Sequence, residues 1–452
     1  MLARQPADAP ARGSFKGAPV TGTIIDQPDA ERRAGLFRRG LSAWFGIALW
    51  KRILFALVLG TIAGLAWGEG AGQIKWIGDI FVRLIRMLVV PLVFLTIASG
   101  VAELADPRRL GSIGIKTIGM YVFTTILAVT VGLVAATLIQ PGAGADFQNA
   151  VPRAVAAPKD TGQMFMDIVP MNPFQAMANG DTLAVIFFAL LIGAGVVAAG
   201  EVADPVRRLL AGGSQVMLKI VGFVMEVAPF GVFALIAVVV GANGPETFVS
   251  ILKLALCVLA GAMFQTFIVH GGVVRLLAWL PVAPFFRGIA DAIMVGFSTS
   301  SSSATLPVAI RVAENNLGVS HPVASTVLPL GATIGMDGAA MYVAMLSLFA
   351  AQAFGVPLDL ADYLVIAATT TIVAMGVAPV PSGSLFVLAA VFAAIGIGPE
   401  QTAIVVGFIL PFDRILDMMR TVPNVTADLA IATTVARWEK ELDVETYQRT
   451  AG

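Results

Sequence analysis

Residues 412–430 read FDRILDMMRTVPNVTADLA, a stretch with three acids and two bases inside the long apolar segment 400–436. At roughly 100° per residue, five polar residues share a helical stripe about 80° wide: Asp413, Asp417, Arg420, Asn424 and Asp428. Each charge at the middle of a membrane costs roughly 2.5–3.5 kcal/mol, so this stripe must line a wet cavity or meet partners within the protein. Internal pairing of Arg420 with Asp413 and Asp417 is the alternative, and it leaves Asp428 unexplained.

The composition is that of an integral membrane protein. The chain has 452 residues, of which 57% are hydrophobic and 13% charged, and its mean hydropathy is +0.86. Soluble proteins carry about 25% charged residues. Lys+Arg and Asp+Glu are equal at 29 each, so we expect the lipid bilayer as surroundings and no nucleic acid as a partner. The single cysteine, Cys257, excludes an intrachain disulfide.

Ten apolar segments approach or exceed the length of a membrane span, about 20 residues: 44–70, 77–103, 113–138, 164–199, 209–241, 247–279, 287–314, 322–355, 361–397 and 400–436. Two are interrupted near their middles, by STSSSSATLP (298–307) and GVAPVPSGS (376–384). Serine, glycine and proline there leave backbone groups that hydrocarbon cannot satisfy. We therefore predict an all-α membrane protein with eight transmembrane helices and two re-entrant helical hairpins, built as inverted repeats. Two kinked spans are the alternative for the interrupted segments.

Both ends of the chain are predicted to lie in the cytoplasm. Residues 1–43 lack a long apolar run and are rich in Pro, Gly, Ala and Arg, which favours a disordered tail. Lys and Arg gather in this tail and in alternate short loops, as expected on the cytoplasmic side. Eight crossings then return the second tail, 437–452, to the same side.

A second intramembrane acid is Asp337, in the stretch GATIGMDGAAMY. Its neighbours Gly335 and Gly338 would let the helix unwind and turn carbonyl groups inward. The alternative is a lone acid that is hydrogen-bonded to a neighbouring Ser or Thr. The two histidines, His270 and His321, lie at the edges of apolar segments, and we interpret both as ordinary boundary residues.

Four motifs carry a resemblance to a known family: TSSSSATLP, LGATIGMDG, VPSGS and DRILDMMRTVPNVTADL, in that order and spacing. They resemble the dicarboxylate/amino acid:cation symporters, and the similarity extends over about 47–436. The resemblance implies a glutamate-transporter-like homotrimer that works as an elevator in the plasma membrane, here a bacterial inner membrane. Within a transporter domain 44–436, it implies scaffold spans 44–103 and 164–241 and moving transport elements 113–138 and 247–436.

The resemblance also implies a substrate site. Arg420 would hold the side-chain carboxylate of a substrate, a task suited to the forked guanidinium group, and Asp417 would hold its ammonium group. Together they favour aspartate or glutamate. Arg414 and Pro381 are implied in gating and charge compensation, with Arg414 expected to reach the serines of the first hairpin or Asp417. The implied substrate-binding residues are Ser301, Ser302, Ser303, Val380, Ser384, Asp417, Arg420, Thr421 and Asn424.

Three cation sites follow from the same resemblance. Asp428, Asn424 and carbonyls near Gly335 would form one, and Asp337, Tyr121, Thr124 and Thr125 a deeper one. Thr333 and the backbone carbonyls of Met375 and Val377 would form the third. Oxygen ligands suit a hard ion such as Na⁺, with H⁺ as the alternative. The family's NMDGT reads GMDGA here, so that one amide and one hydroxyl are missing.

The alternatives differ in class. A proton- or sodium-coupled symporter of C4-dicarboxylates or of neutral amino acids would share the fold. A channel would share some features, but paired gates favour alternating access. An intramembrane hydrolase using Ser301, Ser302 or Ser303 lacks a nearby basic partner, so we expect no enzyme. The sequence contains no P-loop motif, which disfavours an ATP-driven pump.

Overall fold

A computed structural model describes residues 47, 49–103, 107–145, 169–180, 182–243, 247–377 and 382–449. The predicted tail 1–43 lies outside these residues, as do Val380 and Pro381. The regular elements of the described ranges are helices, accompanied by one isolated β-bridge between Val319 and Leu442. The prediction of an all-α protein is therefore confirmed for the described part of the chain.

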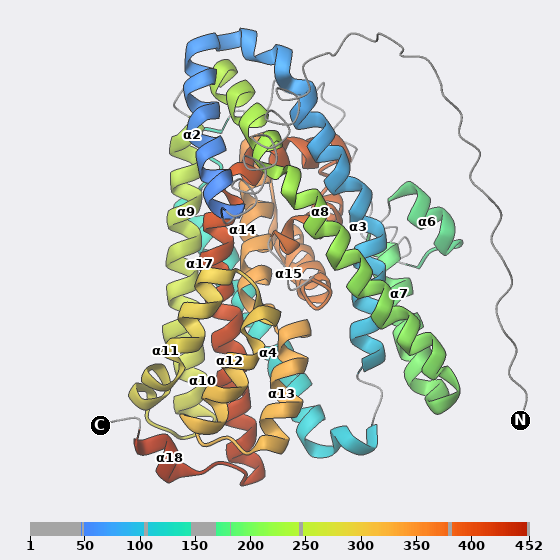
Figure 1. Ribbon diagram of the computed structural model, residues 1–452, viewed down its shortest axis with the longest axis vertical. Coiled ribbons are helices and arrows are strands. Elements are labelled where there is room, and N and C mark those ends of the chain that lie inside the picture. Colours follow the sequence, from blue (N-terminus) through green and yellow to red (C-terminus); the bar gives the residue numbers. More distant parts are fainter. Residues whose placement is uncertain are drawn as a thin grey trace, which may run out of the picture. The chain divides into compact units, whose positions relative to one another are not determined.

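Figure 1 shows the helices coloured along the chain, and most of them fall within the apolar segments. They are α2 (Leu49–Trp67), α3 (Lys75–Glu103), α4 (Pro107–Ile139), α6 (Pro173–Asn179), α7 (Thr182–Ala199), α8 (Asp204–Asn243), α9 (Thr247–Met263), α10 (Gly271–Leu276), α11 (Val282–Thr299), α12 (Ser302–Asn315), α13 (His321–Ile334), α14 (Asp337–Phe354), α15 (Leu360–Ala374), α16 (Leu388–Ala394), α17 (Pro399–Glu439) and α18 (Val444–Arg449). Short 3₁₀ turns η1 (Gly68–Ile74), η2 (Gly200–Ala203) and η4 (Gly383–Phe386) and a π-helical segment η3 (Phe264–His270) connect some of them.

Five helical stretches in the described residues are long and apolar enough to cross a membrane. They are Lys51–Leu84, Ser112–Ile139, Ala184–Glu226, Phe248–Leu276 and His321–Phe354. Helix α17 has sufficient length, 41 residues, but its charged stripe lowers its hydropathy. The described part of the chain is thus a multi-helical membrane protein, while the number of eight spans stays a prediction.

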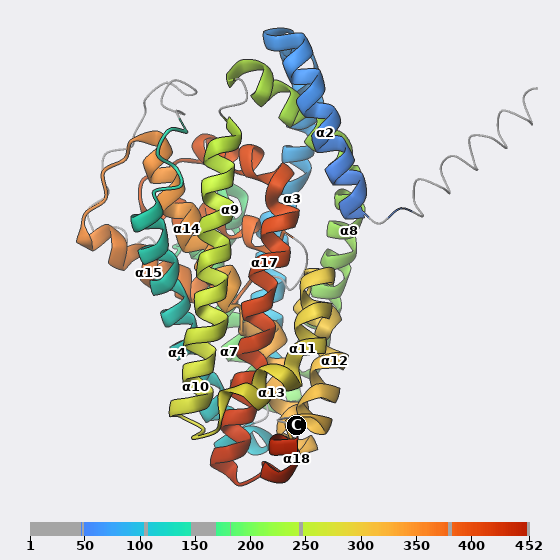
Figure 2. The ribbon, with the colours of Figure 1, turned by 90° about the vertical axis from the view of Figure 1, so that its left-hand side faces the viewer.

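Two groups of helices pack among themselves. In one, α3 lies against α7 and α8, and α2 approaches α8 so closely that a Cβ at Gly60 would lie 2.6 Å from the Phe233 carbonyl oxygen. In the other, α17 contacts α4, α9, α11, α13 and α14. Figures 1 and 2 both show α17 beside α9 and α11. Helix α14 is apolar on nearly every side because it is enclosed by the second group, and only Gln352 of its residues is not buried.

Three breaks in helical structure come together around α17. The first separates α11 from α12 at Ser300, whose φ of 54° places it in the left-handed region, and α11 and α12 then pack against each other. The second separates α13 from α14 at Gly335 and Met336. The third lies between α15 and α16, where η4 contacts α14 and α3. These breaks fall where the serines, glycines and prolines predicted them.

Two boundaries differ from the sequence prediction. The segment 164–199 is divided, because Asn172 caps a separate helix α6 and Gly180 ends it in a left-handed conformation. The end of the chain is not a plain tail over its described part. Helix α17 runs to Glu439, and the buried Tyr447 of α18 donates a hydrogen bond to the Pro281 carbonyl at 2.7 Å.

Candidate functional site

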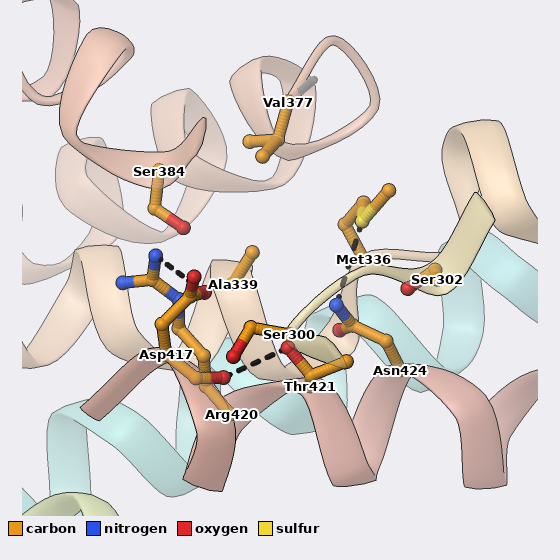
Figure 3. Close-up of a pocket in the computed structure, with 10 residues that line it drawn as sticks. All are labelled: Ser300, Ser302, Met336, Ala339, Val377, Ser384, Asp417, Arg420, Thr421 and Asn424. Atoms are coloured by element: carbon orange, nitrogen blue, oxygen red, sulfur yellow. Dashed lines mark hydrogen bonds and ion pairs between the residues drawn. The ribbon is translucent and has the colours of Figure 1, made fainter. Parts of the chain in front are cut away.

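The helix breaks line a small polar cavity of about 20 Å³. Figure 3 shows side chains of α17 on one side of it, with Ser384 and Val377 facing them from the other. The volume is enough for about one water molecule. The lining residues are Ser300, Ser302, Met336, Ala339, Val377, Ser384, Asp417, Arg420, Thr421 and Asn424.

Arg420 is the central charge of this cavity and pairs with two acids of its own helix. Its guanidinium pairs with Asp413 at 3.1 Å and with Asp417 at 2.8 Å. It also lies 4.4 Å from the centre of the Tyr342 ring, whose hydroxyl donates to Asp413 at 3.0 Å. The internal pairing considered as an alternative is therefore present, and it uses two of the three acids of the stripe.

Asp417 joins the stripe to the third helix break. Its Oδ2 accepts a hydrogen bond from the Ser382 backbone N–H at 2.9 Å. The Thr421 hydroxyl donates to the Asp417 backbone carbonyl at 2.8 Å, which is the usual bond of a threonine to its own helix. Asp417 thus connects Arg420 with the turn that carries Ser384.

The serines of the first break face different directions. Ser302 lines the cavity beside Ser300, while Ser301 caps α12 by accepting a hydrogen bond from the Ala304 N–H at 3.2 Å. Ser303 lines a second cavity. Arg414 donates to the Thr299 carbonyl at 3.3 Å, so it contacts this turn through the backbone next to the serines.

The predicted first cation site has a free ligand atom. Asp428 is buried, and its Oδ1 has no hydrogen-bond partner among the described residues. The Tyr121 side chain and Asp428 Oδ1 both crowd Gly335, where an added Cβ would lie 2.7 Å from that oxygen. Asn424, one turn before Asp428, accepts the Gly338 N–H at 2.7 Å. A buried acceptor atom beside a hydroxyl and an amide fits a hard cation.

The predicted deeper site is occupied by protein donors. Asp337 begins α14, is fully buried, and accepts hydrogen bonds from Thr124 and Thr125 on Oδ1 at 3.2 and 2.9 Å. Its Oδ2 accepts from Gln265 at 3.3 Å and contacts His270 Nε2 at 3.0 Å. The interpretation of His270 as a boundary residue was wrong, because the π-helical segment η3 turns its ring inward.

The residues of the predicted third cation site lie on one cavity. Thr333, Met375 and Val377 line a hollow of about 320 Å³ together with Ser303 and residues of α3 and α8. The Thr333 hydroxyl donates to the Pro329 carbonyl at 3.2 Å. This hollow separates the two packing groups of helices over part of their length.

Several residues of the site were missed by sequence reasoning. Ser300, Met336 and Ala339 line the first cavity, and each lies next to a motif residue that was singled out. Gln265 and His270 were recognisable only as polar residues within an apolar segment, a pattern that is a functional hypothesis by default.

A cavity deep among apolar helices, with an ion-paired arginine and closed by helix breaks, defines a membrane transporter site. The comparisons agree: a family model described as the sodium:dicarboxylate symporter family matches residues 49–438. The chain belongs to the sodium:dicarboxylate symporter family. This is a family of transporters and not of enzymes, so the hydrolase alternative does not fit.

The relatives carry names for two kinds of substrate. A proton/sodium-glutamate symport protein of Geobacillus stearothermophilus is 34% identical over 411 residues, 88% of this chain and 96% of the relative. A proton/glutamate-aspartate symporter of Bacillus subtilis (strain 168) is 35% identical over 396 residues, 86% and 94% of the two chains. A C4-dicarboxylate transport protein of Anaeromyxobacter sp. (strain K) is 34% identical over 404 residues, 88% and 91%.

Proposed function

We propose that this protein is a secondary symporter that moves an acidic amino acid, aspartate or glutamate, together with Na⁺. The observation that carries the proposal is the buried Arg420–Asp417 pair at 2.8 Å, which faces a cavity lined by residues of all three helix breaks. An arginine and an aspartate side by side match a substrate that has both a carboxylate and an ammonium group.

Loading requires an exchange of partners. A substrate carboxylate would replace Asp413 at Arg420, and a substrate ammonium would meet Asp417. The present cavity, about 20 Å³, is too small for an amino acid. The turn that carries Ser382 and Ser384 must therefore move away, which breaks the bond from the Ser382 N–H to Asp417. This supports the second hairpin, including Pro381 and Val380, as the gate.

Coupling to a cation is supported by the charges of α17. Asp413 and Asp417 share Arg420, and Arg414 lies near the same end of the stripe. Asp428 has no such basic partner and keeps a buried oxygen without a hydrogen bond among the described residues. A cation at Asp428 would remove the cost of burying an unpaired carboxylate. H⁺ in place of Na⁺ is the alternative.

The architecture we propose follows from the packing. Helices α2, α3, α7 and α8 would form a scaffold at the centre of a homotrimer. The helices around α17 would move as an elevator within a bacterial inner membrane, with both termini in the cytoplasm. The hollow of about 320 Å³ between α3, α8 and the first helix break supports a boundary that can slide. Eight spans and two re-entrant hairpins belong to this proposal.

Transport of a C4-dicarboxylate is the second candidate, since relatives with that name are about as similar as the glutamate carriers. Asp417 argues against it. A dicarboxylate has no ammonium group, so a second anion would be placed beside this acid without compensation.

Uptake of radiolabelled aspartate and succinate into proteoliposomes tests the proposal, under imposed Na⁺ or H⁺ gradients. We expect aspartate to accumulate only with a cation gradient, and Arg420→Ala and Asp417→Ala to reduce uptake at least about 100-fold. Arg420→Ala leaves the buried Asp413 and Asp417 without their ion-pair partner, and Asp417→Ala removes the acid that would hold the substrate ammonium. The control is Arg311→Ala, since Arg311 of α12 forms only an exposed ion pair, with Asp291 of α11.

Two results would change the assignment. Accumulation of succinate without aspartate would favour the dicarboxylate carrier. Flux that is independent of any gradient and proceeds at channel rates would remove the symporter.

A further inference from the structure

We propose that His270 and Gln265 close the site at Asp337 to cations, so that Asp337 holds no coupling ion in this chain. The inference deepens the proposed function, on which it rests, because it decides which buried acids take part in ion coupling. It makes His270 a residue that determines the ion coupling of the transporter.

Four side chains surround the carboxylate of Asp337. An ionised carboxylate offers about four acceptor positions. Thr125 donates to Oδ1 at 2.9 Å, and the Thr124 hydroxyl lies 3.2 Å from both Oδ1 and the Tyr121 carbonyl oxygen, which share its one proton. Gln265 and His270 occupy Oδ2 at 3.3 and 3.0 Å. A cation at this carboxylate would have to displace at least one of the four donors.

Two of these donors are nitrogen atoms, which a hard cation does not choose as ligands. Gln265 Nε2 also donates to the Thr124 carbonyl at 3.4 Å, so its N–H groups cover a second oxygen of the predicted site. His270 Nδ1 has no partner among the described residues. Since a buried N–H without an acceptor is rarer than an unused acceptor, the ring proton belongs on Nε2, where it is donated to Asp337.

The backbone is arranged to bring these two side chains together. On an α-helix, positions five apart differ by about 140° and face different ways. The segment η3 (Phe264–His270) is a π-helix, in which residue i pairs with i+5 and such neighbours align. Gln265 and His270 therefore meet, with 3.2 Å between Gln265 Nε2 and His270 Nε2, and both side chains are fully buried. π-Helical turns are rare and concentrate at functional sites.

Position 335 agrees with this, because Gly335 has no side chain that could add a ligand. An added Cβ at Gly335 would collide with the Tyr121 ring and lie 2.7 Å from Asp428 Oδ1. No side-chain oxygen can therefore be supplied from position 335 to a cation near Asp337. Asp428 has a carboxylate oxygen without a hydrogen bond among the described residues, and Asp337 has none; beside Asp337, Gln265 Oε1 is also without a partner, while the Nε2 of the same amide faces the carboxylate.

The test is thermal unfolding of the purified full chain in detergent, with Na⁺ exchanged for choline at constant ionic strength. We expect Asp337→Asn to keep the Na⁺ response of the wild type. We expect His270→Leu to gain a further Na⁺-dependent rise of about 2 °C or more in apparent Tm, because Oδ2 loses a donor and becomes available to the ion. The double variant His270→Leu/Asp337→Asn should lose that gain.

The control is His321→Leu, since His321 is exposed and pairs with Glu314 at 2.6 Å. It should behave as the wild type. If His270→Leu is recovered only as aggregate, His270→Asn, which is too short to reach Oδ2, takes its place in the same comparison.

Two results would overturn the inference. One is a Na⁺ response that Asp337→Asn removes, which would mean that Gln265 turns its amide oxygen toward a bound ion. The other is a folded His270 variant without any gain. Neither depends on transport, whereas failure of the proposed function would appear as gradient-independent uptake in proteoliposomes.

Discussion

Asp428 and Asp337 are both buried acids, yet their surroundings differ. Asp428 keeps one oxygen without a hydrogen bond among the described residues, while Asp337 is contacted by four side chains. The same residue type is therefore left open for an ion in one place and satisfied by the protein in the other. The donors around a carboxylate, and not the carboxylate itself, indicate whether it can bind a cation.

The largest effect is expected at Asp428, the acid that keeps an oxygen without a hydrogen bond among the described residues. Asp428→Asn should raise the Na⁺ concentration for half-maximal aspartate uptake by roughly 100-fold or more. The reason is that removing one partner of a buried charge pair, here the carboxylate that would pair with Na⁺, costs about 3–5 kcal/mol. Proteoliposome uptake over a range of Na⁺ concentrations measures it. Asp79→Asn is the control, since Asp79 forms only an exposed ion pair with Lys75 at 3.9 Å. An unchanged Na⁺ dependence in Asp428→Asn would contradict the assignment of the coupling cation to Asp428.

A smaller effect is expected at Gly335, which lies two residues before Asp337 and against Asp428 Oδ1. Gly335→Ala should destabilise the protein by about 1–3 kcal/mol, because the new methyl group would push against Tyr121 and Asp428. Thermal unfolding without substrate measures it. Gly119→Ala, on α4 with nothing near the new Cβ, should be neutral or stabilising by up to about 1 kcal/mol. Equal behaviour of the two variants would mean that position 335 has room for a side chain.

The smallest effect is expected at Asp337, the acid that is contacted by four side chains. Thr125→Val removes one of the four donors of Asp337 and should cost about 1 kcal/mol in thermal unfolding, the usual contribution of a hydrogen bond. Thr130→Val on the same helix should change little, because Thr130 is exposed and its hydroxyl bonds the Ile126 carbonyl of its own helix. A loss at Thr130 as large as that at Thr125 would show that the hydroxyls act on the helix alone.

The sequence predicted the features that depend on local periodicity. The charged stripe of α17 is one helical face, and all five of its polar residues are buried. The helix breaks fall at the serines near Ser300 and at Gly335, as predicted. Such breaks must be buried within the protein, because hydrocarbon cannot satisfy the backbone groups that an interrupted helix leaves unpaired. The motifs at these places also carried the resemblance that the family comparison confirms.

The partners of Asp337 could not be predicted because they depend on distant contacts and on an unusual backbone. Gln265 and His270 are 72 and 67 residues away in sequence. Helical periodicity places them on different faces, and only the π-helical segment η3 aligns them. The ion pairs of Arg420 were foreseen from spacing as an alternative, but the contact of Tyr342 with both Arg420 and Asp413 was not.

Anomalous diffraction from crystals grown with Tl⁺ in place of Na⁺ tests most directly where the coupling cation lies. The expected result is an anomalous peak within ligand distance of Asp428 Oδ1 and none at Asp337, whose Oδ2 remains bonded to Gln265 and His270. A peak beside Asp337, with the His270 ring turned away from it, would contradict the distinction between the two acids.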